Sequence, residues 1–142
     1  MATYTKYEPA IEGMLNELID FFGTTDVYKV AIHTDAPTVA TDDELADLTQ
    51  IGGSNGYTTG GSDITFNSTR TGGTITATAV DTVFTASGGN LGASTTGRYF
   101  SYHDDTSTTD RLLASWDYGS TFTVADGETM TVNFGASLAT AA

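Results

Sequence analysis

Residues 97–135 read GRYFSYHDDTSTTDRLLASWDYGSTFTVADGETMTVNFG, and this stretch decides the fold class. Its apolar-rich segments are separated at short, even intervals by Asp, Ser, Thr and Gly. This pattern predicts antiparallel strands joined by tight turns, over 98–103, 111–118, 121–124 and 129–134. Asp126-Gly127 is a hairpin signal, so we expect the last two of these strands to form a hairpin.

Similar segments precede this stretch, over 26–34, 63–70, 73–79 and 82–86. A total of about seven or eight short strands favours a mainly β domain, an antiparallel, jelly-roll-like β-sandwich. Successive side chains of a strand point to opposite faces. The apolar face of each segment therefore predicts the core: Val30, Ile32, Ile64, Phe66, Ile75, Phe84, Leu112, Ala114, Trp116, Val132 and Phe134. In segment 26–34 the other face, which carries Ala31 and His33, is expected to lie outside the core.

One amphipathic helix is predicted over residues 8–22. Apolar residues recur there at intervals of three and four, with Pro9 in the first turn and Gly23 just past the end. The apolar stripe has two interpretations: it packs on the chain's own sheet, or it docks on a neighbouring subunit. We expect residues 1–7 to form an extended arm before this helix.

The rest of the chain is expected to be a single domain, residues 8–142. It comprises the helix, a β-sandwich over 26–135 and a short C-terminal tail. Within it, residues 42–48 predict one short helical turn, because their acidic residues suit a helix N-terminus. The glycine-rich segment 52–61 predicts a surface loop anchored by Tyr57.

The composition excludes several classes of protein. Five Lys and Arg against eighteen Asp and Glu give a net charge of -13, which disfavours nucleic acid and anionic membranes as partners. There is no cysteine, so neither disulfides nor thiolate metal sites are available. No apolar run approaches the roughly 20 residues that span a bilayer. The first residues lack the basic and apolar regions of a cleaved signal, so we expect no export by that route.

The sequence offers little catalytic chemistry. His33 and His103 are the only histidines, and His103-Asp104-Asp105 is the one cluster suited to a metal or a general base. Residues 104–110 are better interpreted as a polar hairpin loop in which Asp and Thr side chains cap backbone amides. The alternative is a calcium ion held by Asp104, Asp105 and Asp110.

Enzymatic signatures are equally weak. No G-x-S-x-G motif is present, and Trp116-Asp117-Tyr118 is the nearest match to an aromatic and carboxylate sugar site. At strand spacing the two rings share one face, which favours packing into the core or an interface. We therefore expect no enzyme, no catalytic or metal site and no cofactor.

Blocks distributed along nearly the whole chain resemble a family of small virion proteins of tailed bacteriophages. The blocks are VYKVAIHTDAPT (27–38), DELADLTQI (43–51), GYTTGG (56–61), TASGG (85–89), GRYFSY (97–102) and WDYGSTFTVADGETMTVNF (116–134). The resemblance implies a structural protein, foremost a capsid decoration (cement) protein on the surface of an HK97-type phage head. A tail or fibre component is the alternative, and an unrelated carbohydrate-binding β-sandwich is the third.

This resemblance also implies partners and a location. The partners would be the major capsid protein and further copies of the chain, in a homo-oligomer. The location would be the virion, after synthesis in the host cytoplasm. Candidate interface residues lie in the N-terminal segment, the glycine-rich loop and one strand: Tyr4, Tyr7, Ile11, Met14, Leu18, Tyr57 and Tyr102.

Overall fold

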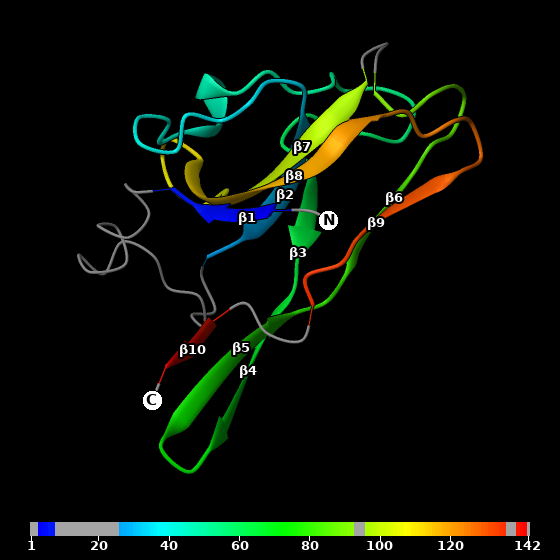
Figure 1. Cartoon of the computed structure of the whole chain (residues 1–142). Helices are drawn as coiled ribbons and strands as arrows, with labels where there is room; N and C mark the ends of the chain where they lie inside the picture. Colours follow the sequence, from blue (N-terminus) through cyan, green and yellow to red (C-terminus); the bar gives the residue numbers. More distant parts are fainter. Residues whose placement is uncertain (1–2, 8–25, 93–95, 136–138, 142) are drawn as a thin grey trace.

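The computed structural model describes residues 3–7, 26–92, 96–135 and 139–141 (Figure 1). Strands dominate this part of the chain, which confirms a mainly β fold built from antiparallel pairs. The elements are β1 (Thr3–Lys6), β2 (Tyr28–His33), the 3-10 helix η1 (Leu45–Asp47), β3 (Ser62–Ile64), β4 (Phe66–Thr71), β5 (Thr74–Ala79), β6 (Thr82–Thr85), β7 (Gly97–Asp104), β8 (Arg111–Phe122), β9 (Thr129–Val132) and β10 (Ala139–Ala141). The helix predicted over residues 8–22 lies outside the described residues.

The strands form three sheets. The largest has the order β1-β8-β7-β2-β3, the second β10-β5-β4, and the third pairs β6 with β9. β7 and β8 are neighbours along the chain and lie at the centre of the five-stranded sheet. The polar loop between them confirms the predicted hairpin turn over residues 104–110.

The predicted core residues are largely buried in one cluster. The buried members are Val30, Ile32, Ile64, Phe84, Leu112, Ala114, Val132 and Phe134. Phe66 and Trp116 are half-buried against this cluster, and the side chain of Ile75 lies outside the described part. Ring contacts join the sheets: Trp116 of β8 meets Phe134 beyond β9 at 5.6 Å between ring centroids. The alternation of apolar residues thus identified the interior well.

β2 is buried on both faces, whereas one buried and one exposed face were expected. Ala31 and His33 are fully buried, although the sequence suggested that their face lies outside the core. Tyr7 lies on that face and is fully buried too, with its hydroxyl 2.9 Å from Ser101. The central strands are therefore covered on both sides, because Tyr7 and other parts of the chain pack where solvent was expected.

One predicted strand boundary and one predicted pairing were wrong. The segments 111–118 and 121–124 were expected to be separate strands, but β8 runs as one strand to Phe122, which pairs with Gly97. The turn at Asp126-Gly127 forms, with Gly127 at φ 82°, yet it does not join two paired strands. β9 instead pairs with β6, from Thr82↔Val132 to Thr85↔Thr129.

The predicted strand 63–70 is also two strands. β3 ends at Ile64 in the five-stranded sheet, and β4 begins at Phe66 in another. The β4–β5 hairpin projects away from the five-stranded sheet, with β10 beside β5 (Figure 1). Beyond Phe66, every residue of β4 is exposed.

Residues 3–6, part of the segment expected to form an extended arm, are an extended strand of the sheet. β1 is an edge strand hydrogen-bonded to β8, in a register from Thr3↔Asp117 to Lys6↔Ala114. Tyr7 continues it with a bond from its backbone N–H to the carbonyl of Leu113 (3.3 Å). This stretch therefore belongs to the sheet. The helical turn predicted over 42–48 is present as η1.

Candidate functional site: the polar interior and the turn of the central hairpin

A row of buried polar side chains crosses the five-stranded sheet. His33 of β2, Ser101 and His103 of β7, and Ser115 of β8 are each at most 3% exposed. The strand register explains the row, since Ser101 lies opposite Ala31 on one side and Ser115 on the other. Buried polar groups are costly unless they are hydrogen-bonded, so the partners of each one decide its role.

Ser101 and His33 form the first part of this interior. The hydroxyl of Ser101 lies 2.8 Å from Nε2 of His33 and 2.9 Å from the hydroxyl of Tyr7. Nδ1 of His33 lies 2.9 Å from the backbone carbonyl oxygen of Asp35. A carbonyl only accepts, so we assign the ring proton to Nδ1. Ser101 then donates to Nε2, and Tyr7 donates to Ser101.

This arrangement matches the geometry of a serine activated by a histidine. The sequence did not indicate it, because the two residues lie on different strands and only the register brings them together. However, Ser101 and His33 are fully buried and Tyr7 covers the hydroxyl. A substrate has no route to the oxygen in this state, so the bonds act as interior cross-links between strands.

Burial sets the protonation of this network. It lowers the pKa of His33, despite the opposing effect of Asp35, so the ring is neutral near pH 7. It also raises the pKa of Tyr7 to about 12. Both groups therefore stay uncharged in the folded protein.

The glycine-rich loop 52–61 is fastened to the chain's own strands. The hydroxyl of Tyr57 accepts from the backbone N–H of Ile32 (3.0 Å) and donates to Oε1 of Gln50 (2.9 Å). Gly61 has φ 84°, and a Cβ there would collide with the carbonyl of Val30. Tyr57 anchors the loop as expected, and the close approach permitted by Gly61 is to β2 of the same chain.

Three of the candidate interface residues are inside the domain. Tyr7, Tyr57 and Tyr102 are all at most 5% exposed, so in this structure they offer no surface to another subunit. Tyr4 lies in β1 opposite Trp116, and its side chain is outside the described part. Ile11, Met14 and Leu18 lie outside the described residues altogether.

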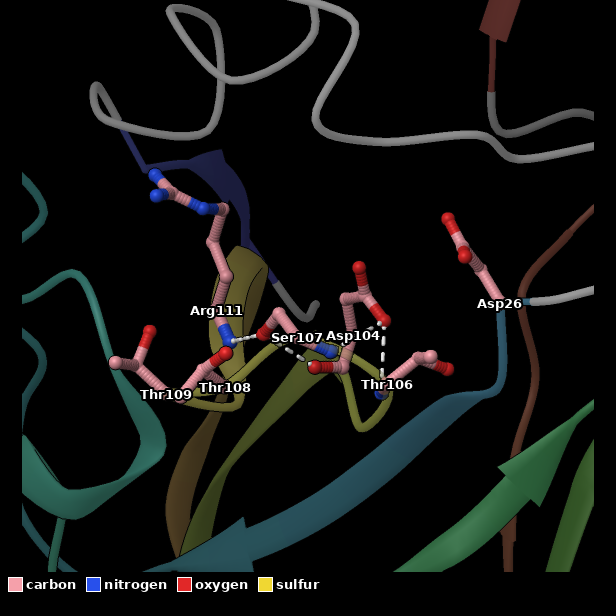
Figure 2. Close-up of a pocket in the computed structure, with 7 residues that line it drawn as sticks. All are labelled: Asp26, Asp104, Thr106, Ser107, Thr108, Thr109 and Arg111. Atoms are coloured by element: carbon pink, nitrogen blue, oxygen red, sulfur yellow. Dashed lines mark hydrogen bonds between the residues drawn. The ribbon is translucent and has the colours of Figure 1, made fainter.

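The turn of the β7–β8 hairpin borders a polar cavity of about 410 Å³ (Figure 2). Asp104 organises this turn: its Oδ1 accepts from the backbone N–H groups of Thr106 (2.9 Å) and Ser107 (3.3 Å). Ser107 donates its hydroxyl to the Asp104 carbonyl and accepts from the N–H of Arg111. These bonds are the side-chain capping expected for a polar loop.

Charges of both signs line this cavity. Figure 2 shows the carboxylates of Asp26 and Asp104 and the guanidinium of Arg111 on the same side of the turn. Burial raises the pKa of Asp104, and the charge of Asp26 adds to the effect. The cavity therefore suits hydroxyl-rich or cationic groups, but it lacks an activated nucleophile among its lining residues.

Asp104 does not join Asp105 and Asp110 as the calcium alternative required. The structure instead groups Asp105 and Asp110 with His103, and one ligand atom from each lies within 4.8 Å of the others. Nε2 of His103 is 3.9 Å from Oδ1 of Asp105, and Lys29 binds the other oxygen of that carboxylate at 2.7 Å. The cluster differs from the expected trio in one member, because the carboxylate of Asp104 caps the backbone of the turn and His103 lies beside the other two.

The members of this trio differ in burial. His103 is fully buried, while Asp105 and Asp110 are half-buried. Burial lowers the pKa of His103 to about 4, with Lys29 also lowering it and Asp105 opposing. Burial also raises the pKa of Asp110, and the charge of Asp105 raises it further. The cluster thus combines a neutral imidazole with two carboxylates that repel each other.

Comparison of the chain with protein-family models, with curated proteins and with solved structures returned no match. Among the described residues, no helix has the length and apolar character to cross a membrane.

Proposed function

We propose that this chain is a virion structural protein that decorates and cements an HK97-type phage head. The resemblance of its sequence blocks to small virion proteins of tailed phages supports this proposal. The observation that carries the proposal is the β4–β5 hairpin, which projects from the domain and buries little within it. The proposed location is the virion surface, after assembly from subunits made in the host cytoplasm.

An isolated two-stranded hairpin is marginally stable in water. β5 gains one neighbour in β10, while the outer edge of β4 pairs with no other described strand. Exposed strand edges are places where other chains add on. A hairpin built this way is suited to contacts between subunits, with the major capsid protein or with another copy as the partner.

The five-stranded sheet would supply the rigid body of the subunit. We propose that the apolar residues of β6 and β9 pack on it as the second layer of an antiparallel, jelly-roll-like sandwich. Phe84 of β6 supports this packing: its ring lies 5.7 Å from that of the loop residue Tyr57, whose hydroxyl is hydrogen-bonded to Ile32 of β2. We further propose that residues 8–22 form the amphipathic helix and dock on a neighbouring subunit in a homo-oligomer.

Exposed aromatic side chains at Tyr102 or Trp116 would favour the carbohydrate-binding alternative. Tyr102 is buried, and Trp116 is half-buried in contact with Tyr102 and Phe134. Neither ring is presented as a stacking platform for a sugar. Tyr118, the other ring of the group at residues 116–118, is exposed, but it packs edge-on against Phe122 at 5.3 Å between ring centroids.

Quantitative mass spectrometry of purified particles tests the proposal. We expect hundreds of copies of the chain per particle, in a fixed ratio to the major capsid protein. A copy number equal to a small multiple of three or six would assign the chain to the tail or fibre instead. Absence of the chain from washed particles would contradict any structural role in the virion.

Two matched substitutions test the hairpin. Thr69 of β4 and Thr131 of β9 are both exposed strand threonines. We expect Thr69→Arg to reduce occupancy on particles that lack the native protein by at least about tenfold, because it places a charged side chain in the proposed contact. Thr131→Arg should leave occupancy unchanged. Equal occupancy of the two variants would exclude the hairpin as the contact.

A further inference from the structure

We propose that His103, Asp105 and Asp110 form a binding site for one divalent transition-metal ion of the Zn²⁺ class. Their ligand atoms already lie within 4.8 Å of one another, and Nε2 of His103 is 3.9 Å from Oδ1 of Asp105. Ligands around a tetrahedral Zn²⁺ at roughly 2.0–2.2 Å stand about 3.4 Å apart. Small side-chain movements would therefore close the site.

The burial and hydrogen bonding of His103 give a second, independent reason to propose a ligand here. Its side chain is fully buried, and neither ring nitrogen has a hydrogen-bond partner among the described residues. A buried polar atom without a partner is unusual in folded proteins and calls for an explanation such as an unseen ion. A metal at Nε2 would satisfy the nitrogen that faces the two carboxylates.

His33 provides the internal comparison. It is equally buried and lies on the neighbouring strand, yet both of its ring nitrogens are hydrogen-bonded. The sequence contains no other histidine and no cysteine. A metal that prefers nitrogen ligands therefore has one available imidazole in this chain, that of His103.

Lys29 fits the proposal as an orienting residue. It lies opposite His103 on β2, and its Nζ binds Oδ2 of Asp105 at 2.7 Å. Oδ1 of the same carboxylate remains on the side of His103. Partners of this kind hold a ligating carboxylate in place. Lys29 and the metal would then use different oxygens of Asp105.

The ligand set selects the class of ion. Ca²⁺ takes six to eight oxygen ligands and Mg²⁺ keeps most of its waters, whereas one imidazole with two carboxylates suits Zn²⁺, Co²⁺ or Ni²⁺. Asp105 and Asp110 are half-exposed, so the ion would enter from the solvent side. Three protein ligands leave a further position for water. The ion would tie the end of β7 to the start of β8.

The test is a Zn²⁺ titration of the purified, chelator-treated full chain, followed by calorimetry and by NMR of the histidine rings. We expect saturable binding of one Zn²⁺ and a shift of the Nε2 signal of His103, with the ring signals of His33 unchanged. Ca²⁺ should bind at least about tenfold more weakly. The NMR measurement uses the unaltered chain, so its result is valid even if a substitution impairs folding.

Three substitutions that remove the same charge complete the test. Asp105→Asn and Asp110→Asn should each weaken Zn²⁺ binding at least about tenfold, a loss of the size seen when a metal site is disturbed. Asp63→Asn is the matched control, since Asp63 also lies near Lys29 but outside the cluster, and should bind as the unaltered chain does. The proposal is overturned by absence of saturable binding, by an unshifted His103 signal, by equal binding of Ca²⁺, or by ligand variants that match the control.

Discussion

The five-stranded sheet and the β4–β5 hairpin are both antiparallel and both rich in residues that favour strands, but they differ in burial. Every residue of β7 except Arg98 is buried, whereas all of β4 beyond Phe66 is exposed. In the sheet, both faces are covered, and even polar side chains such as Ser101 and His33 are enclosed and hydrogen-bonded. Among the hairpin side chains that the structure describes, Phe66 and its partner Ala79 pack against the core cluster.

This difference in burial indicates that the two regions contribute differently to stability and to assembly. Burial of apolar surface is the main source of folding free energy, and the chain concentrates it in the five-stranded sheet and its immediate neighbours. The hairpin adds exposed backbone edge, and its described contribution to the interior is small: Phe66, Ala77 and Ala79. We infer that the sheet holds the domain together, and that the hairpin is available for contacts with other chains.

The largest effect is expected in the centre of the sheet. Leu112 of β8 is fully buried in the core cluster, so Leu112→Ala removes buried methyl groups and leaves a cavity. We expect the free energy of unfolding to fall by about 2–5 kcal/mol, measured by urea denaturation. A loss below about 1 kcal/mol would show that the sheet is not the stabilising region.

A smaller effect is expected in the polar interior. Ser101→Ala leaves Nε2 of His33 and the hydroxyl of Tyr7 without the partner that they share. We expect a loss of about 1–3 kcal/mol, the usual cost of a buried polar group left unsatisfied. Ser101→Thr, which keeps the hydroxyl, should recover part of the loss in the same denaturation experiment. A neutral Ser101→Ala would indicate that water replaces the hydroxyl.

Mild acid should act on the same interior. Because burial lowers the pKa of His33 in the folded protein, the unfolded chain binds more protons just below the ordinary value of about 6.5. Stability should therefore fall as the pH drops from about 7 to 5.5, by up to about 1.4 kcal/mol per pH unit for His33 and by a similar amount for His103, whose pKa burial lowers to about 4. An NMR titration of the His33 ring checks the cause, and a midpoint at or above 6.5 would contradict it.

The smallest effect is expected on the hairpin. Thr69 of β4 is exposed and lies opposite Thr76 in the neighbouring strand. We expect Thr69→Ala to change the free energy of unfolding of the isolated chain by less than about 0.5 kcal/mol. A change as large as that of Ser101→Ala, in the same urea experiment, would remove the distinction between the two regions.

Local patterns predicted the elements and most of the core correctly. Alternation identified Val30, Ile32 and Leu112 as buried, and the Asp and Thr content of residues 104–110 predicted the turn that Asp104 caps. The alternation failed where a residue is covered by a segment that is distant in the sequence. Ala31 and His33 were expected outside the core, and they are buried because their face is covered by other parts of the molecule.

Local sequence patterns did not predict which strands pair with one another. Asp126-Gly127 marks a turn in the sequence and forms one in the structure, yet β9 pairs with β6 and not with the strand just before the turn. A two-residue signal fixes the local reversal of the chain only. The partner of the following strand depends on which distant edge is free and which apolar faces match.

The sequence by itself determined that this chain is built of short strands, that its alternating apolar residues form the core, and that the charge of -13 disfavours anionic partners. Only the tertiary structure decided which polar residues meet. Ser101 reaches His33 across a register between β7 and β2, and His103 joins Asp105 and Asp110 while Asp104 caps the turn. The physical reason is range: side-chain alternation acts over a few residues, whereas register and the covering of a sheet face are set by packing between segments distant in sequence.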